Sequence, residues 1–338
     1  MKPIAITMGD AAGIGPEIVA KSFRDHPADT RGCFVAGDVE AIRRGAKAIA
    51  RDGDTDLPVA AIESPADALD APPRCIPVLQ VTQLPSLPAY GQVSAEAGRA
   101  AAEAVVWSAR AALTGDIAAV VTAPLHKEAL SAAGVRFPGH TELLQSEAAA
   151  WMKKDVRDVP VRMMLANDEL RTVLVSIHVS LRDAIEAVTF DNVLSTLRIA
   201  HESLSRALGR TPRLGVAGLN PHAGEAGLFG REELEVIGPA IQAARALHVD
   251  ASGPFAPDTV FMRARRGEFD AVIAMYHDQG LIPVKYLGVE KGVNVTLGLP
   301  LVRTSPDHGT AFDIAGQGIA DEASLVEAIR VARRLAGS

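Results

Sequence analysis

The sequence PIAITMGDAAGIGPE occupies residues 3–17 and leads from an apolar run through a glycine-rich turn to a proline. We expect a buried strand over Pro3–Met8 and a helix from about Pro16, because proline suits the first turn of a helix. The glycines are spaced G-x-x-x-G-x-G, which differs from the dinucleotide-binding pattern G-x-G-x-x-G, and the lysine of a phosphate loop does not follow. A plain tight turn and an anion-binding turn are both open readings. The stretch therefore predicts a strand–turn–helix unit.

Apolar runs of strand length alternate with helical stretches along the rest of the chain. Further strands are predicted at Gly32–Ala36, Val59–Ile62, Ile117–Thr122, Arg171–Ile177, Arg213–Leu219 and Ala271–Tyr276. Several are continuous apolar runs, which is typical of parallel strands covered on both faces. Helices are predicted at Ser94–Thr114, at Asp191–Leu208 and from about Arg231, and a hairpin at Val161–Leu165 with Arg171–Ile177. The proline-rich stretch Ala71–Tyr90 is expected to be irregular. The fold class is therefore α/β with mostly parallel sheets.

Length and composition agree with this class. The chain of 338 residues has room for two domains or for one large α/β unit with two lobes. Apolar residues make up 48% of it and aromatic residues only 4%, so aliphatic side chains must fill the core. This composition favours helices packed on a parallel sheet over a β-sandwich.

Charge and cysteine content exclude several classes of protein. The net charge of −7, without a concentrated basic run, argues against nucleic acid as a partner but not against a small anion in a local pocket. Cys33 and Cys75 lie in apolar runs and are expected to be core residues. No apolar stretch reaches the roughly 20 residues of a membrane span, and no signal-peptide pattern opens the sequence. We expect a cytoplasmic protein that binds neither nucleic acid nor membrane.

Three histidines follow predicted strands. His178 comes after the strand at Arg171–Ile177, and His222 and His277 come after two later strands. Ligands of open α/β sheets bind at the carboxyl ends of strands, so three imidazoles delivered there can converge on one metal ion. Three protein ligands leave coordination positions open for a substrate, as a catalytic metal requires. The alternative is that each histidine only hydrogen-bonds its own loop.

A second group of polar residues suits an anionic substrate. His140 and Thr141 lie in a Gly-His-Thr loop before a predicted helix, and Lys285, Asn294 and Arg303 follow His277 in the sequence. Cations and an amide near a metal fit a phosphate or carboxylate group. Taken one at a time, each lysine or arginine reads equally well as ordinary surface charge.

Several motifs together resemble one known family. They are TMGD (7–10), GIGPE (13–17), GHTE (139–142), LNPHAGE (219–225), MYHDQG (275–280) and GVNVTLGLP (292–300). In this order they resemble 4-hydroxythreonine-4-phosphate dehydrogenase over essentially the whole chain. The segment DHGTAFDIAG (307–316) is also similar to the cofactor loop of isocitrate and isopropylmalate dehydrogenases, which bind a nicotinamide cofactor without the G-x-G-x-x-G pattern. Ala11 departs from the proline usual in the first loop of the family.

The resemblance implies two α/β/α lobes around a central cleft, as in isocitrate and isopropylmalate dehydrogenases. Residues 1–125 and 304–338 would form the cofactor lobe, and residues 126–303 would carry the metal, the substrate and a dimer interface. NAD or NADP would bind near Asp307, His308 and Gly309 in the cofactor loop.

The resemblance also assigns the site residues. The metal ligands fall on His178, His222 and His277, with His277 supplied by the partner subunit of a homodimer. The substrate contacts fall on His140, Thr141, Lys285, Asn294 and Arg303. Lys285 is the candidate for proton transfer, and Asp258 and Asp278 are candidates to orient ligating histidines. The ion would be Zn, Mg, Co or Mn.

The reaction implied is metal-dependent, NAD(P)-linked oxidation with decarboxylation of 4-phosphohydroxy-L-threonine to 3-amino-2-oxopropyl phosphate, a step in the biosynthesis of pyridoxal phosphate. Relatives that resemble this chain act on threonate or erythronate 4-phosphates or on a cyclic cis-dihydrodiol dicarboxylate, so the same chemistry on one of these is the alternative. A non-catalytic protein that binds an anionic metabolite is the alternative from another class.

Overall fold

The computed structural model describes residues 2–50, 57–288 and 292–337. The chain divides into two compact units, unit 1 from Met1–Val159 with Leu299–Ser338, and unit 2 from Pro160–Gly298. These bounds differ from the predicted ones, which assigned residues 126–159 and 299–303 to the second lobe. Residues 126–159 belong to unit 1 because α5 (His140–Met152) packs on α3 (Ala95–Thr114). Residues 299–303 belong to it because the strand that begins at Arg303 pairs with the strand Ala119–Thr122.

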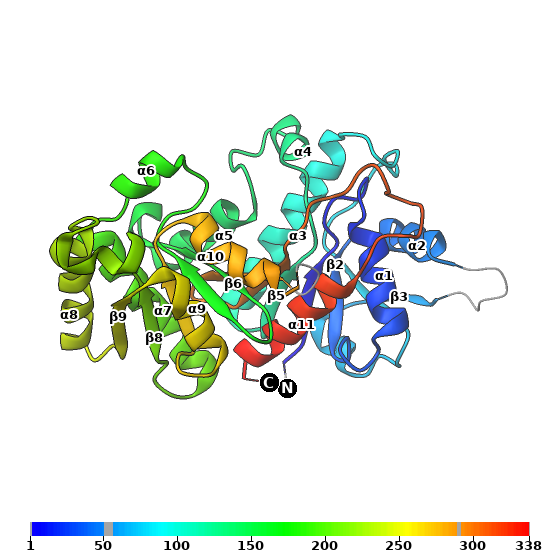
Figure 1. Cartoon of the computed structure of the whole chain (residues 1–338). Helices are drawn as coiled ribbons and strands as arrows, with labels where there is room; N and C mark the ends of the chain where they lie inside the picture. The colour runs from blue at the N-terminus through cyan, green and yellow to red at the C-terminus, as the bar shows by residue number, and fades with distance from the viewer. Residues whose placement is uncertain (1, 51–56, 289–291, 338) are drawn as a thin grey trace. The chain divides into compact units, whose positions relative to one another are not determined.

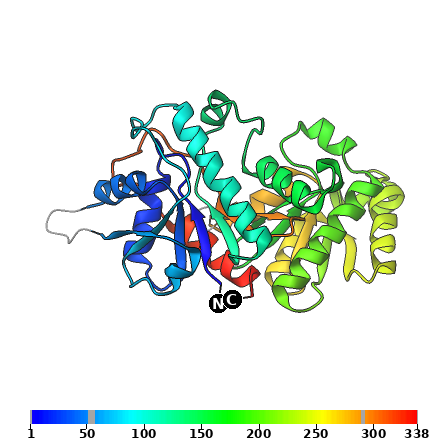
Figure 2. The same ribbon diagram turned by 180° about the vertical axis from the view of Figure 1, so that it is seen from behind.

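Unit 1 is built on a parallel sheet. Its strands are β1 (Ile4–Thr7), β2 (Cys33–Gly37), β3 (Val59–Ile62), β4 (Ile76–Gln80), β5 (Ala119–Thr122) and β12 (Arg303–Pro306), in the order β3-β4-β2-β1-β5-β12. The helices are α1 (Gly15–Asp25), α2 (Val39–Ala48), α3, α4 (Lys127–Ala132), α5 and α11 (Ala323–Leu335), with short turns η1 (Pro65–Leu69) and η2 (Val156–Asp158). Every residue of β1 is buried, as the apolar run predicts. Figures 1 and 2 show α11, in red, beside the blue N-terminal elements.

Unit 2 has a mixed sheet. Its strands are β6 (Arg162–Ala166), β7 (Arg171–Leu174), β8 (Leu214–Ala217), β9 (Ala251–Phe255), β10 (Ala271–Ala274) and β11 (Val293–Leu297), in the order β11-β6-β7-β10-β8-β9. Strand β6 runs antiparallel to both of its neighbours, and the other pairs are parallel. The helices are α6 (Leu181–Glu186), α7 (Phe190–Leu208), α8 (Gly238–Ala246), α9 (Pro257–Arg265) and α10 (His277–Tyr286), with the turns η3 (Pro221–Gly227) and η4 (Glu233–Ile237). The predicted α/β class with mostly parallel strands is confirmed.

Capping chemistry sets the ends of the long helices. The Ser94 side chain accepts a hydrogen bond from the Ala97 amide at 3.2 Å at the start of α3, and Gly115 ends that helix in the left-handed conformation. In the predicted hairpin of β6 and β7, the Asn167 side chain accepts from the Glu169 and Leu170 amides at 2.9 and 2.8 Å. These local predictions are confirmed.

One prediction of irregular structure is wrong. The stretch Ala71–Tyr90 contains β4, whose apolar run Ile76–Gln80 pairs with β2 and β3. Prolines on both sides of this run, and Pro77 within it, conceal the strand in the sequence. Burial of the run between two neighbouring strands outweighs the low strand preference of proline.

Candidate functional site

The three predicted metal histidines follow strands that share one edge of the unit 2 sheet. Strands β7 and β8 both run parallel to β10, so the carboxyl ends of all three lie at the same edge. His178 follows β7, His222 lies in η3 after β8, and His277 begins α10 directly after β10. The alternation of strands and helices therefore delivers all three imidazoles to one side of the sheet.

Two of these histidines lie close together within one chain. The ring centroids of His178 and His277 are 5.6 Å apart, with an angle of 46° between the ring planes. The Nδ1 atom of His277 lies 2.7 Å from Oδ1 of Asp278. A carboxylate on one ring nitrogen orients the imidazole and leaves the other nitrogen for a ligand. Asp258, the other candidate for this role, is exposed in the first turn of α9.

His222 is not gathered with this pair. It is exposed, and its ring centroid lies 6.1 Å from that of Phe229. Within residues 2–50, 57–288 and 292–337, no cluster of three His, Cys, Asp or Glu side chains is arranged to hold a metal ion. The donor chemistry nevertheless fits a divalent transition metal, because it offers two neighbouring imidazoles and a third at the same sheet edge.

Unit 1 contains a buried cationic group at the start of α5. The Arg303 side chain is buried, and its Nε and Nη2 donate to the hydroxyl oxygen of Thr122 at 3.1 and 2.7 Å. Burial lowers the pKa of Arg303 to about 10, so the guanidinium stays charged at neutral pH. His140 begins α5, and its Nε2 is buried with no hydrogen-bond partner in the described part of the chain. A buried cation, an unpaired ring nitrogen and a helix N-terminus together suit an anion.

The other predicted substrate residues are more open. Thr141 is half-buried in the first turn of α5, and Asn294 is half-buried on β11. Lys285 is exposed near the end of α10, the helix that His277 begins. His140, Thr141 and Arg303 therefore belong to unit 1, whereas Lys285 and Asn294 belong to unit 2 with the histidines.

The stability of the protein should depend on pH through His140. Burial and then the charge of Arg303 hold the pKa of His140 well below its ordinary value of 6.5, against the opposing hydrogen bond to the Ala123 backbone. As the pH falls below 6.5, the unfolded chain takes up this proton and the native protein does not, so stability is lost. We expect His140→Gln to reduce the fall in melting temperature between pH 7.5 and about pH 5.5, as measured by circular dichroism. If the melting temperature of His140→Gln depends on pH as strongly as that of the parent, His140 is not the source of this pH dependence.

The glycine-rich first loop is tied to the predicted cofactor loop. The Ile14 amide donates to the Thr310 carbonyl at 3.0 Å, and a Cβ added at Gly13 would lie 2.9 Å from the same oxygen. This explains why a residue without a side chain is needed at Gly13. His308 and Gly309 are exposed beside this contact. The buried Ala11 carbonyl accepts from Arg44 at 2.6 Å, so the residue that departs from the family pattern is still held in place.

Two polar groups near these loops were not among the predicted site residues. One carboxylate oxygen of the buried Asp10 and the Nδ1 of His126 have no hydrogen-bond partner among the described residues. Burial raises the pKa of Asp10, and the charge of His126 opposes that rise. The His126 ring stacks on Phe312 at 4.5 Å. The signal in the sequence was the polar turn after β5, which ends in His126 and Lys127.

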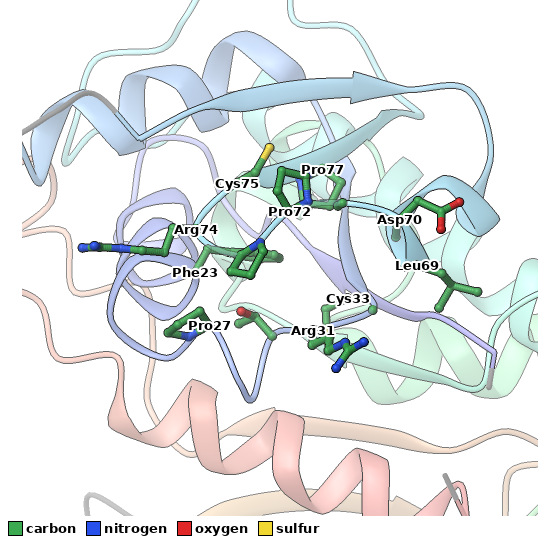
Figure 3. Close-up of a pocket in the computed structure, with 15 residues that line it drawn as sticks. Phe23, Pro27, Arg31, Cys33, Leu69, Asp70, Pro72, Arg74, Cys75 and Pro77 are labelled. Carbon is green, nitrogen blue, oxygen red and sulfur yellow. The ribbon is translucent and has the colours of Figure 1, made fainter.

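A cavity of about 480 Å³ lies elsewhere in unit 1, at the amino ends of β2 and β4. Figure 3 shows Cys33 and Cys75 among its lining residues, and it contains none of the predicted site residues. Both cysteines are buried, as predicted, and neither is bonded to the other in a disulfide. Burial raises the pKa of the Cys33 thiol to about 12, which makes it unreactive at neutral pH.

Comparison with known proteins identifies the family. The sequence pattern of the family described as pyridoxal phosphate biosynthetic protein PdxA matches residues 29–332. A protein of Beijerinckia indica named 4-hydroxythreonine-4-phosphate dehydrogenase is 54% identical, over 98% of this chain and 95% of its own length. The chain belongs to the PdxA family. The resemblance found in the sequence motifs is thereby confirmed.

Two further PdxA relatives extend this result. A D-threonate 4-phosphate dehydrogenase of Cupriavidus necator is 47% identical, over 98% of this chain and 97% of its own. The crystal structure of a 4-hydroxythreonine-4-phosphate dehydrogenase from Klebsiella pneumoniae, 40% identical, matches with a TM-score of 0.89 and covers 100% of this chain and 98% of that one. The prediction of a dehydrogenase is confirmed. None of the described helices combines the length and the apolar character needed to cross a membrane.

Proposed function

We propose that this PdxA chain oxidises 4-phosphohydroxy-L-threonine, with decarboxylation to 3-amino-2-oxopropyl phosphate, as a cytoplasmic enzyme of pyridoxal phosphate biosynthesis. The observation that carries the proposal is the buried cationic group formed by Arg303 and the start of α5, which suits the phosphate or carboxylate end of such a substrate. The 54% identity to a relative named for this activity supports the choice of substrate.

His178, His222 and His277 are the residues that would hold a divalent ion. When bound, such an ion supplies a Lewis acid that lowers the pKa of the substrate alcohol and stabilises negative charge during loss of carbon dioxide. Asp278 contacts Nδ1 of the His277 ring, which would leave Nε2 to bind the ion. The imidazole set suits zinc or cobalt, and family resemblance keeps magnesium and manganese as candidates.

The remaining residues bind and orient the substrate. Arg303, held by Thr122, keeps a positive charge in a buried place where a phosphate or carboxylate is bound more strongly than in water. The pKa of His140 lies well below 6.5, so its ring is neutral at physiological pH and offers Nε2 as a hydrogen-bonding group. Thr141, Lys285 and Asn294 complete the proposed contacts, with Lys285 moving the proton of the alcohol.

NAD or NADP is the proposed hydride acceptor, as expected for a dehydrogenase family. Asp307, His308 and Gly309 follow β12 at the carboxyl edge of the unit 1 sheet, where ligands of parallel sheets bind. The contact between Ile14 and Thr310 fixes this loop against the first turn. The loop would therefore offer the exposed His308 and Gly309 to the cofactor.

A second substrate is supported by a specific observation. The 47% identical relative from Cupriavidus necator is named for D-threonate 4-phosphate. The two substrates differ at one position, which carries an amino group in 4-phosphohydroxy-L-threonine and a hydroxyl group in D-threonate 4-phosphate. The test is a panel of 4-phosphohydroxy-L-threonine, D-threonate 4-phosphate, D-erythronate 4-phosphate and a cis-dihydrodiol dicarboxylate, each with added divalent metal and NAD or NADP. We expect the first to give the highest kcat/KM, and a preference of more than tenfold for another would overturn the assignment.

We also propose a homodimer. Several apolar side chains are exposed on the unit 2 segments that follow β7, β8 and β10: Val179, Leu181, Leu228, Phe229, Ile282 and Tyr286. Exposed apolar side chains of this kind suit an interface with a second copy of the chain. Family resemblance assigns His277 of each site to the partner, while the 5.6 Å pair within one chain favours His178 and His277 from the same subunit.

Mixed dimers distinguish these arrangements. His178→Ala and His277→Ala chains should each be inactive. If the partner supplies His277, a dimer of one chain of each kind contains one intact site, and mixing after reversible dissociation should restore activity. If both histidines come from one subunit, neither site of the mixed dimer is intact and the mixture should stay inactive. The readout is reduction of the nicotinamide cofactor.

A further inference from the structure

The loop that carries His222 has a backbone conformation that needs support from outside. The φ angles of residues 222–226 are all positive, from +42° at Glu225 to +80° at Gly224. Residues other than glycine are disfavoured in the left-handed region by roughly 1–2 kcal/mol each. Such a conformation persists only where the surroundings over-determine it. The orientation of the His222 imidazole therefore depends on the groups that hold this loop.

One buried carboxylate holds the start of the loop. Glu233 is 3% exposed, and its Oε1 accepts from the Leu219 and Asn220 amides at 2.7 and 2.8 Å. Its Oε2 accepts from Nδ2 of Asn220 at 3.0 Å. A Cβ added at Gly224 would lie 2.6 Å from Oε2, so the loop also closes over this carboxylate. Glu233 thereby fixes the backbone before His222, and Gly224, after His222, packs against the same carboxylate.

A second side chain ties this loop to the one that carries His277. Gln279, two residues after His277, donates from Nε2 to the Gly218 carbonyl at 2.8 Å and accepts from the Met275 amide at 2.7 Å. Gly218 directly precedes the amides that Glu233 holds. The backbone after β8 is therefore tied both to η4 and to the beginning of α10.

We infer that Glu233 is a positioning residue for the proposed metal site, acting as a hydrogen-bond acceptor that sets the place of His222. The inference rests on the proposed function, in which His222 is a metal ligand. It assigns the role to Oε1 of Glu233, the oxygen that accepts from both backbone amides, rather than to the negative charge.

The test uses the full chain stripped of metal and titrated with Zn²⁺ against a competing chelator. Glu233→Met keeps a buried side chain of similar length and leaves the two amides without a partner. We expect its Zn²⁺ affinity to fall about 10- to 100-fold, as for other groups that orient metal ligands. In Glu233→Gln the amide oxygen still accepts from both amides, so most of the affinity should return. The visible absorption bands of Co²⁺ bound to Glu233→Met should also shift, while those of Glu233→Gln should match the parent.

Controls separate the possible outcomes. Glu235→Gln changes an exposed glutamate on the same turn and should bind Zn²⁺ like the parent. If His222→Ala binds Zn²⁺ normally, the proposed metal site itself is wrong. If His222→Ala loses the metal and Glu233→Met binds within threefold of the parent, only the inference about Glu233 fails. It also fails if Glu233→Gln, in which one oxygen still accepts from both backbone amides, is as weak as Glu233→Met.

A second variant tests the inference if Glu233→Met folds poorly. In Gly218→Ala the added methyl would lie 3.0 Å from Oε1 of Glu233 and 2.9 Å from Cα of Ala223, so it disturbs the same contact and leaves the carboxylate in place. We expect a weaker Zn²⁺ affinity with a cooperative unfolding transition. Parent-like affinity in this variant would overturn the inference.

Discussion

His277→Ala should abolish tight metal binding and, with it, cofactor reduction. The His277 imidazole lies 5.6 Å from that of His178 and is oriented by Asp278, so it is the best prepared of the three proposed ligands. Loss of a supporting group alone costs up to about 100-fold in metal affinity or activity, and loss of a ligand should exceed this. The measurement is metal content after dialysis, together with the rate of NAD or NADP reduction.

The matched control is another exposed histidine of unit 2. His248 has a positive φ of 62° and lies outside the proposed site. In His248→Asn an asparagine, which tolerates this backbone conformation, replaces the imidazole. We expect normal metal content and normal activity. If His277→Ala keeps one metal ion per site and full activity, the three-histidine site is wrong.

Arg303→Met should weaken binding of the phosphorylated substrate far more than binding of the cofactor. The guanidinium is buried on the hydroxyl of Thr122, and the pKa of about 10 keeps it charged in a place shielded from water. Charge-assisted hydrogen bonds of this kind contribute about 1.5–3 kcal/mol, so KM for the substrate should rise by about 10- to 100-fold. Steady-state kinetics with each substrate varied in turn gives both constants.

Arg303→Lys separates charge from geometry. A lysine keeps a positive charge and loses the planar fork of donors, so it should recover only part of the affinity. Thr304→Val, on the same buried strand, serves as a control for disturbance of β12. A rise in the KM of the cofactor equal to that of the substrate would contradict the assignment of Arg303 to the anionic end.

The sequence predicted the parts of the structure that depend on local chemistry. The apolar run before the first glycine, the caps at Ser94 and Gly115 and the turn at Asn167 each determine their own element, and all were found as expected. The strand at Ile76–Gln80 was not predicted, because its position is decided by neighbouring strands rather than by its own residues. The bounds of the two units likewise depend on the packing of α5 on α3, which no local pattern encodes.

The site was predictable to a similar degree. Strand ends in the sequence were enough to place three histidines at one sheet edge. The distances between these histidines could not be predicted, because the pairing of His178 with His277 and the isolation of His222 follow from loop conformations. Arg303 was named as a candidate cation, but its burial against Thr122 could not be predicted, since this contact joins residues far apart in the chain. The polar turn after β5 contains His126, but no spacing in the sequence predicts the buried, unpaired polar atoms of Asp10 and His126.

The pairing of β12 with β5 has a consequence for synthesis of the chain. Unit 1 begins at the N-terminus but is completed by residues from Leu299 onward, whereas unit 2 is one continuous segment. On the ribosome, unit 2 can therefore fold while the edge of β5 in unit 1 still awaits its last strand. Non-local pairing of this kind is slow and leaves an open strand edge until it forms. Nascent chains arrested before Arg303 should therefore be protected from protease in unit 2 earlier than in unit 1.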